Sequence, residues 1–383
     1  MNNYIVITPF FPSSKSFRGS YLLDQAKAIQ LNSNYNLLVI ILTPFLNKSA
    51  GNYTIEGIKC ITFRVFDFPS FILPGLFNTF NFKRLIKFLD KNSISVDNES
   101  IIHGHINYPS LNFLDLFLRK YSCKTILQHH GLDVLQKKTG LSIPFLKHFQ
   151  NQYILKIFKK LSLNVTTHIA VSSVVKSNLI KINSRLANKI YICLNGVDTT
   201  KFYAIPSIKN NETKYIIGCV ANFWEIKDQI TLLKAVNILK GKGINNIHIK
   251  FVGTGKTKKK CVEYAKINNI NCEFINELKH NELITFYNNL NLFVLPSKYE
   301  AFGCVYLEAL ACGVPFIGVK GQGIQDIVKN EHKKYQLIEP GSSEDLSKLI
   351  YYFYSKESTI QFDKKYEIEN TVKEMLKHIK AQN

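Results

Sequence analysis

Residues 292–318 read LFVLPSKYEAFGCVYLEALACGVPFIG, and this stretch decides the fold of the second half of the chain. Its apolar run at 292–295 predicts a buried strand, 305–312 a helix and 315–318 a second buried strand. Strands that are apolar throughout and joined through a helix are typical of a parallel sheet covered on both faces. The stretch therefore predicts an α/β fold.

The same alternation runs in both directions from this stretch. In the first half, a helix is predicted at 21–31 and strands at 4–8, 36–42, 58–63, 100–103, 125–128 and 168–171. In the second half, helices are predicted at 228–239, 258–268 and 281–288 and further strands at 215–220, 248–252 and 272–274.

A chain of 383 residues is too long for one hydrophobic core, so we predict two domains. They are two Rossmann-like, doubly wound parallel-sheet domains, at 1–195 and 196–383, facing each other across a ligand-binding cleft. The polar stretch 208–214 is interpreted as their linker. We expect the last helix, about 365–383, to pack back on the first domain.

The composition indicates a folded, basic protein: 46% of residues are hydrophobic and the formal net charge is +21. Residues 1–195 hold 23 Lys and Arg against 8 Asp and Glu, a net charge of +15. Such a surface favours anionic partners, although lysine-rich surfaces also simply keep proteins soluble. None of the eight cysteines forms a C-x-x-C pair, which indicates reduced, buried thiols rather than disulfides.

No signal peptide and no stretch of membrane-spanning length is visible. We therefore expect a cytoplasmic protein that, where it meets a membrane, lies on the inner face as a peripheral protein.

The stretch that decides the fold also carries chemistry. A loop with Glu300 and Gly303 leads from a strand into the helix that bears Glu308. Backbone amides and the positive end of a helix form a site for phosphate, and a glycine lets the backbone approach a ligand closely. Carboxylates can accept hydrogen bonds from sugar hydroxyls. Solvent-exposed acids on an ordinary loop and helix are the alternative interpretation.

With its flanking residues, P-S-x-x-E-A-F-G-x-V-x-L-E-A-L-A-C-G-V-P, this stretch resembles the E-x7-E motif of retaining GT-B glycosyltransferases of family 4, the glycosyl transferases group 1. Further resemblances cover most of the chain. They lie at 193–202 (the N-G-V-D hinge segment), 251–255 (V-G-x-G), 170–173 (A-V-S), 129–133 (H-G-x-D) and 8–30, the first loop, which includes Gly19.

The resemblance implies roles for individual residues. Glu300 would contact the hydroxyls of the donor sugar, and Glu308 those of the ribose. Amides around Phe302, Gly303 and Cys304 would hold the sugar and the diphosphate. Lys227 would neutralise the leaving diphosphate. In the first domain, His130 would lie above the reacting sugar, and Gly19 would bring the backbone to the phosphate and the acceptor.

One position departs from the family pattern. The usual G-R-L sequence reads Ala221-Asn222-Phe223 here, so that Asn222 replaces an arginine. A hydrogen bond from a charged group contributes about 1.5–3 kcal/mol, against roughly 1 for a neutral one. The substitution weakens the expected hold on diphosphate without removing it, and Arg18 is a candidate substitute cation.

Metal-dependent chemistry is not expected. Retaining transfer requires negative charge to be stabilised on the departing diphosphate, and a lysine, backbone amides and a helix end can supply this. The sequence shows no D-x-D pair, and the histidines at 103, 105, 129 and 130 lack the spacing and the second cluster of a zinc site. His103 and His105 are candidates for acceptor contacts or for structural histidines. We expect no cofactor and no metal.

An acceptor on a lipid carrier is suggested by two basic, aromatic stretches in the first domain. Residues 145–161 read FLKHFQNQYILKIFKKL, a basic amphipathic pattern, and residues 63–88 add aromatic side chains with Lys83, Arg84 and Lys87. Ordinary domain helices are the alternative. An anionic membrane surface is therefore a candidate partner.

The sequence as a whole predicts a metal-independent glycosyltransferase of the hexosyltransferase type. It would move a sugar from a nucleotide-sugar donor to a lipid-linked glycan acceptor with retention, in surface polysaccharide biosynthesis such as capsule or O-antigen. A catalytically degenerate GT-B partner subunit is the alternative, because Asn222 replaces a cation. No motif supports specific nucleic-acid binding.

Overall fold

The computed structural model describes residues 2–14, 16–47, 51–67, 75–131, 144–206, 214–356 and 360–382. The chain divides into two compact units, one formed by Met1–Leu194 with Ile368–Asn383 and the other by Asn195–Glu367. The chain therefore passes between the units at Leu194–Asn195 and again at Glu367–Ile368. The predicted linker at 208–214 lies almost wholly outside the described residues.

The first unit contains an eight-stranded sheet in the order β3-β4-β2-β1-β5-β6-β7-β8. All neighbours pair in parallel except β3 and β4. The strands are β1 Asn3–Thr8, β2 Asn36–Pro44, β3 Tyr53–Ile55, β4 Ile58–Val65, β5 Ile101–His105, β6 Lys124–His129, β7 Thr167–Ala170 and β8 Ile190–Ile192. The helices are α1 Ser20–Leu31, α2 Asn78–Lys91, α3 Asn107–Lys120, α4 Pro144–Leu161, α5 Ser173–Ile182 and α12 Ile368–Lys380, with a 3-10 helix η1 at Ser184–Lys189.

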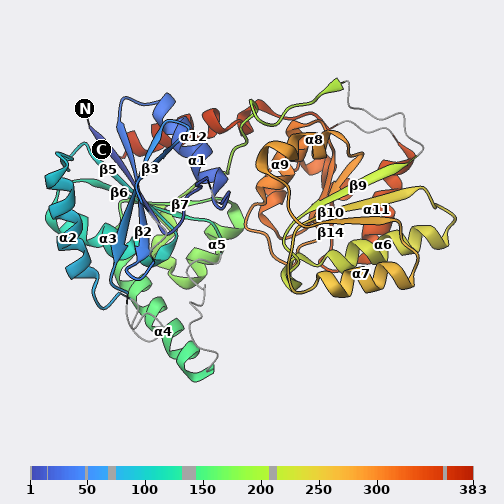
Figure 1. The fold of residues 1–383 in the computed structure, drawn as a ribbon, viewed down its shortest axis with the longest axis horizontal. Helices are drawn as coiled ribbons and strands as arrows, with labels where there is room; N and C mark the ends of the chain where they lie inside the picture. Colours follow the sequence, from blue (N-terminus) through green and yellow to red (C-terminus); the bar gives the residue numbers. More distant parts are fainter. Residues whose placement is uncertain are drawn as a thin grey trace. The chain divides into compact units, whose positions relative to one another are not determined.

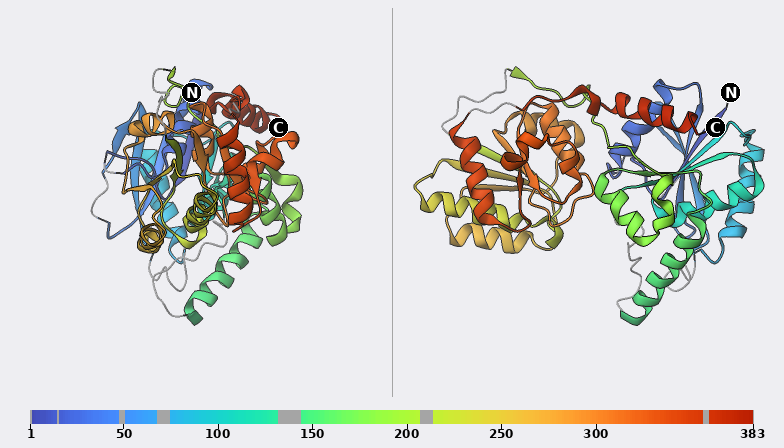
Figure 2. Two further views of the ribbon diagram at one scale, coloured as in Figure 1. Left: turned by 90° about the vertical axis from the view of Figure 1, so that its right-hand side faces the viewer. Right: turned by 180° about the vertical axis from the view of Figure 1, so that it is seen from behind.

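Helices cover both faces of this sheet (Figures 1 and 2). Helices α1 and α12 pack side by side on one face, and α2 and α3 lie on the other. The apolar side chains of β1, such as Tyr4 and Val6, are buried in the same core as Leu22 of α1 and Met375 of α12. Helix α12 thus completes the core of the first unit. The earlier segment of that unit ends at Leu194, and the chain returns to it only at Ile368.

A β-hairpin at the edge of this sheet was absent from the sequence-based prediction. Strand β3 pairs antiparallel with β4 through Glu56 and Gly57, which have φ values of 45° and 82°. Two successive residues with positive φ are typical of the tight turns that join hairpin strands. Strand β3 is only partly buried, so it carries no continuous apolar run that would have predicted it.

The second unit contains a six-stranded parallel sheet in the order β11-β10-β9-β12-β13-β14. The strands are β9 Tyr215–Val220, β10 Ile247–Val252, β11 Cys272–Ile275, β12 Leu292–Val294, β13 Phe316–Val319 and β14 Leu337–Ile338. The helices are α6 Gln229–Gly241, α7 Lys258–Ile267, α8 Leu283–Asn288, α9 Cys304–Ala311, α10 Lys333–Gln336 and α11 Ser343–Ser355. The 3-10 helices are η3 Glu225–Lys227, η4 His280–Glu282, η5 Gly323–Asp326, η6 Asn330–His332 and η7 Lys364–Tyr366. Helices α6, α7 and α11 cover one face and α8 and α9 the other (Figure 1).

Both sheets have a topological switch point, where strand order reverses. In the first unit it lies between β1 and β5, and in the second between β9 and β12. At such a point the loops leaving the carboxyl ends of two adjacent strands turn to opposite faces and leave a crevice for a ligand. The predicted fold class, two Rossmann-like parallel-sheet units, is confirmed. Among the helices that the structure describes, none combines the length and apolar character that crossing a bilayer requires.

The packing of α12 predicts that it is needed for the stability of the first unit. Met375 is completely buried, whereas Lys373 on the same helix is exposed. We expect Met375→Ala to lower the free energy of unfolding by about 2–5 kcal/mol, because it leaves a cavity in the core. Lys373→Ala should change it by less than about 0.5 kcal/mol. Urea unfolding measures both, and equal effects would contradict this account of the core.

Candidate functional site at the two switch points

An ion pair joins the loops that leave the two strands at the switch point of the second unit. Lys227 belongs to η3, after β9, and Glu300 belongs to the loop after β12. Lys227 Nζ donates to the Glu300 carboxylate, and the two side chains are 23% and 15% exposed. The charges are therefore shielded from most of the solvent yet accessible from the crevice.

The loop that bears Glu300 is held from both sides. The backbone N–H of Glu300 donates to Gln322 Oε1 at 2.9 Å, and Gln322 Nε2 donates to the carbonyl of Lys298 at 2.9 Å. The N–H of Lys298 donates to the carbonyl of Ile226, beside Lys227, at 2.8 Å. Both ends of the ion pair are thus fixed by backbone hydrogen bonds. Sequence analysis missed Gln322, because nothing in its local pattern shows that it reaches a distant loop.

Gly303 turns the chain from this loop into α9. It lies at φ 81°, and a Cβ at this position would come within 2.7 Å of the ring of Tyr306. A left-handed residue with no room for a side chain requires glycine. The N–H groups of the first turn of α9, which begins at Cys304, point toward the start of the helix, where its dipole is positive. Phe302 is buried and packs beneath this turn rather than presenting its side chain to solvent.

Glu308 lies one turn into α9 and accepts a hydrogen bond of 2.8 Å from the Tyr287 hydroxyl. Burial, followed by the charge of Glu308, raises the pKa of Tyr287 well above its usual value. The tyrosine therefore remains protonated and acts as the donor. This bond holds the carboxylate of Glu308 in a fixed position on the helix.

Asn222 lies in the loop after β9, where its side chain is exposed. Its carbonyl accepts from Gln229 Nε2 at 3.1 Å, which fixes the backbone but leaves the position of the side chain unconstrained. A Cβ on Gly253, in the neighbouring loop after β10, would lie 2.2 Å from the carbonyl oxygen of Ala221. The V-G-x-G turn therefore serves close packing between these two loops.

The other predicted site residues lie in the first unit, Gly19 in the loop after β1 at the switch point and His130 directly after β6, the neighbour of β5. Gly19 lies at φ 88° immediately before α1, and Phe10 occupies the space that a Cβ would need. The guanidinium of Arg18 lies 4.5 Å above the ring of Phe10. Tyr21, two residues after Gly19, places its ring 5.0 Å from that of His130. The two predicted residues are thus linked through Tyr21.

Three histidines stack next to one another at the same edge. His103 and His105 project from the same face of β5, with ring centroids 4.3 Å apart, and His105 stacks on His130 at 5.2 Å. His103 and His105 are only 0% and 2% exposed, so their interpretation as acceptor contacts is wrong. Burial is the largest cause that lowers the pKa of His103 to about 3 and that of His105 well below its usual value.

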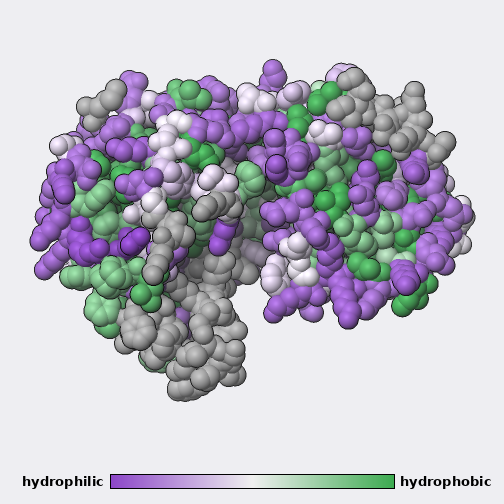
Figure 3. All heavy atoms as spheres, in the orientation of Figure 1, coloured by the Kyte–Doolittle hydropathy of each residue, from purple (hydrophilic) through white to green (hydrophobic). Residues whose placement is uncertain are grey.

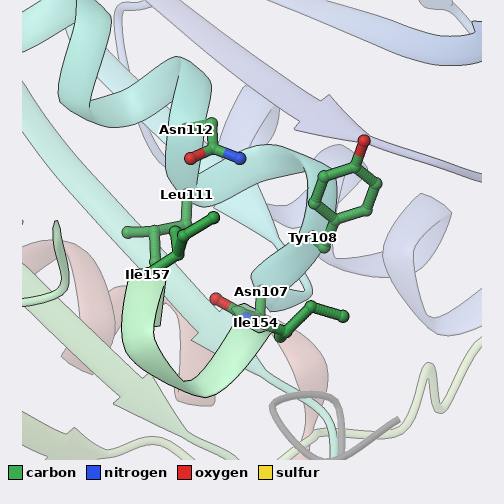
Figure 4. A pocket seen from close by; sticks show the side chains of 6 residues that line it. All are labelled: Asn107, Tyr108, Leu111, Asn112, Ile154 and Ile157. Carbon is green, nitrogen blue, oxygen red and sulfur yellow. The ribbon is translucent and has the colours of Figure 1, made fainter. Parts of the chain in front are cut away.

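A small hollow lies between α3 and α4 (Figure 4). Asn107, Tyr108, Leu111 and Asn112 from α3 face Ile154 and Ile157 from α4 across it. Its volume of about 10 Å³ leaves room for little more than one water molecule. The inner side of α4 is apolar here, because Ile154 and Phe158 are buried, while Lys156, Lys159 and Lys160 are exposed. The side chains of Phe145 and Lys147 lie outside the described residues.

The structure thus collects the predicted residues at two places. Six of them surround one switch point: Lys227, Glu300, Phe302, Gly303, Cys304 and Glu308. Asn222 lies in the same loop as Lys227, after β9. In the other unit, Gly19 follows β1 at the switch point and His130 follows β6, the strand next to β5. Within the residues that the structure describes, no group of three metal-ligating side chains is found. All eight cysteines are free, and six of them are buried.

Comparison with known proteins agrees with this arrangement. Residues 34–201 match the family described as Glycosyltransferase Family 4, and residues 203–371 match Glycosyl transferases group 1. The capsular polysaccharide biosynthesis glycosyltransferase CapM of Staphylococcus aureus is 29% identical over 231 residues, covering 55% of this chain and 59% of that protein.

Solved structures show the same fold over the whole length. The lipopolysaccharide outer core galactosyltransferase WaaB, in its apo form, aligns with all of this chain and all of its own at a TM-score of 0.73 and 16% identity. Anabaena HepE, in complex with UDP and glucose, aligns at a TM-score of 0.65 and 16% identity, covering 99% of this chain and 96% of its own.

The chain belongs to the family 4, or group 1, glycosyltransferases, and its fold is GT-B. It is a glycosyltransferase with relatives in capsule and polysaccharide biosynthesis at low sequence identity.

The hydrogen bonds of Gln322 predict a large effect on activity from a residue that carries no charge. Gln322→Ala removes both bonds to the loop of Glu300, so we expect kcat/KM to fall about 10- to 100-fold, because small misplacements of reacting groups are costly. Gln325→Ala is the matched control, since the side chain of Gln325 accepts a hydrogen bond from the backbone N–H of Gly321 and not from the loop of Glu300. Steady-state kinetics on folded variants measure the difference, and equal rates would show that Gln322 does not position this loop.

Proposed function

We propose that this protein is a retaining, metal-independent glycosyltransferase that moves a sugar from a nucleotide-sugar donor to a lipid-linked glycan acceptor in surface polysaccharide biosynthesis. The observation that carries the proposal is the ion pair between Lys227, in the loop after β9, and Glu300, in the loop that leads into α9. In this unliganded arrangement each charge neutralises the other. A diphosphate at the start of α9 would compete for Lys227, which releases Glu300 to accept hydrogen bonds from the donor sugar.

The chemistry of this site suits the departure of a diphosphate. Negative charge accumulates on the leaving phosphate in the transition state, so groups that bind charge more strongly there accelerate the reaction. Lys227 supplies a full positive charge, and the N–H groups from Cys304 onward supply the positive end of α9. These groups replace the divalent cation that other glycosyltransferases use. Glu308, fixed by Tyr287, is placed to accept from the ribose hydroxyls.

A nucleoside diphosphate sugar is the donor class that the comparisons support, because HepE, which shares the fold, was solved with UDP. Retention of the anomeric configuration is proposed on the resemblance of the segment from Glu300 to Glu308 to the E-x7-E motif. A degenerate partner subunit, the alternative raised by Asn222, would leave this crevice without donor.

A panel of UDP-, GDP-, ADP- and dTDP-sugars tests the donor site. We expect saturable binding and slow hydrolysis of one class, undiminished by EDTA. Lys227→Ala should lower kcat about 10²- to 10³-fold. Removing a single group that stabilises developing negative charge has an effect of this size in other enzymes. Lys234→Ala, which removes an exposed lysine from α6, should leave the rate unchanged.

Two outcomes would count against this proposal. If the folded wild-type protein binds none of these donors, the degenerate alternative holds. If Lys227→Ala turns over donor at the wild-type rate, the diphosphate is not bound at this switch point. The anomeric configuration of the product, read from its proton NMR coupling, tests retention in the same assay.

An aromatic and basic surface supports a lipid-linked acceptor. Phe45 follows β2 and Phe66 follows β4, and their rings stack at 4.1 Å. Phe80 of α2 lies 5.6 Å from Phe66, and the guanidinium of Arg84 lies 5.1 Å from Phe66 and 5.9 Å from Phe80. We call these four residues the α2 patch. Phe45 and Phe80 are 43% and 51% exposed, and Figure 3 shows hydrophobic side chains over the α2 region.

The α2 patch suits the surface of an anionic membrane. It lies at the carboxyl ends of β2 and β4, the same edge of the sheet as Gly19 and His130. Exposed aromatic rings insert at the headgroup level, and each nearby cation adds about 1 kcal/mol of attraction to anionic lipid. A membrane bound at this edge would present a lipid-linked glycan close to the first switch point.

Vesicle co-sedimentation tests the α2 patch. We expect the wild-type protein to bind vesicles that contain anionic phospholipid more strongly than zwitterionic ones. The double variant Phe80→Ser, Arg84→Gln should weaken that binding roughly tenfold, because it removes an inserted ring and a charge. Tyr351→Ser, an equally exposed aromatic in the second unit, is the control. Binding that is unchanged in the double variant would place the membrane contact elsewhere.

A further inference from the structure

The histidine stack includes a direct bond between two imidazoles. His105 Nδ1 and His130 Nε2 lie 2.9 Å apart, within hydrogen-bonding distance. One nitrogen must donate and the other accept, because two lone pairs or two N–H groups cannot bond. The protonation form of His130 is therefore tied to that of His105.

We propose that His105 is a positioning residue that fixes the ring orientation and the tautomer of His130. This rests on the proposed function, since it assigns a partner to the histidine that we expect at the reacting sugar. His105 does not reach the crevice itself, because it is only 2% exposed. It acts on the reaction through His130, which is half-buried.

His105 is suited to this role because it stays neutral. Burial, then the nearby His103 and His130, lowers its pKa well below the usual value. Among the residues that the structure describes, the titratable groups in printed contact with the pair are His103 from β5, Tyr21 from α1 and, beyond His103, Tyr4 from β1. A permanently neutral imidazole carries one N–H and one lone pair at any physiological pH.

The ring of His105 is itself held in place. It stacks on His103, whose Nδ1 is 2.8 Å from the Tyr4 hydroxyl. The carbonyl of His105 accepts from Ser110 Oγ at 2.7 Å. Tyr21 packs against the ring of His130 at 5.0 Å. The two bonded imidazoles are therefore braced by neighbours on both sides, so the bond between them defines one orientation.

Backbone strain marks the same position. Ile106, directly after His105, has φ 68° and ψ 140°. A β-branched residue with positive φ is a genuine outlier, and such residues persist where the surroundings enforce them. Here the N–H of Ile106 donates to the carbonyl of Gln128 at 3.0 Å, at the end of β6 beside His130. The strained turn thus ties the strand of His105 to the strand that leads to His130.

Two substitutions of His105 separate positioning from packing. His105→Phe keeps an aromatic ring for stacking but removes both nitrogens. His105→Asn places an amide where Nδ1 was and retains a hydrogen bond to His130. If His105 positions His130, the asparagine variant should resemble the wild type more closely than the phenylalanine variant does, despite its smaller volume.

Nitrogen-15 NMR of the histidine rings in the full-length protein provides a readout independent of glycosyl transfer. His130→Gln assigns the His130 signals among the ten histidines. We expect one tautomer of His130 in the wild type and in His105→Asn. In His105→Phe we expect a mixture of tautomers and a shifted titration of His130. In donor turnover, His105→Phe should lower kcat about 10- to 100-fold with little change in KM, and His105→Asn should recover most of the loss.

An unchanged His130 tautomer and titration in a folded His105→Phe variant would overturn the proposal. If that variant does not fold, a mixture of His130 tautomers in the wild type or in His105→Asn would overturn it equally. If the wild-type protein turns over no donor, the proposed function fails, but the NMR result still decides whether His105 fixes His130.

Discussion

The ion pair of Lys227 and Glu300 is the interaction on which the donor side depends. It joins the loops of β9 and β12 where the order of the second sheet reverses, so its position follows from topology. Two opposite charges near each other and partly shielded from water stabilise the loops while no ligand is present. In the proposed function this pair exchanges partners, because a diphosphate at the start of α9 competes with Glu300 for Lys227.

The proposed exchange requires no movement of the backbone, because the surrounding residues hold both loops in place. Gln322 holds the loop of Glu300 through backbone atoms, and Gly303 sets the entry into α9. Gly323 packs directly against the loop that bears Glu300, so that a Cβ on Gly323 would fall 1.8 Å from the carbonyl oxygen of Ala301. Because the loops are fixed, we expect donor binding to change the partners of side chains and not to order the backbone. Groups that are already in position stabilise developing charge without a reorganisation cost during the reaction.

Sequence patterns predicted the features that depend on contiguous residues, such as strands, helices and the loops between them. Apolar runs predicted the buried central strands, and Gly303 with the acids Glu300 and Glu308 marked the loop and helix for which phosphate binding is proposed. The antiparallel strand β3 was not predicted, because it is only partly buried and has no apolar run. The role of Gln322 was not predicted, because a loop, a helix and a strand separate it in sequence from its partner Lys298. The bond between His105 and His130 is likewise invisible in sequence, since it joins residues on adjacent strands that only the folded sheet brings together.

A crystal structure of the protein with UDP bound tests the central claim most directly. The account predicts the diphosphate at the start of α9, with Lys227 Nζ moved from the Glu300 carboxylate to a phosphate oxygen and Glu308 near the ribose hydroxyls. A structure with UDP bound elsewhere, or with the pair of Lys227 and Glu300 intact beside the nucleotide, would contradict it.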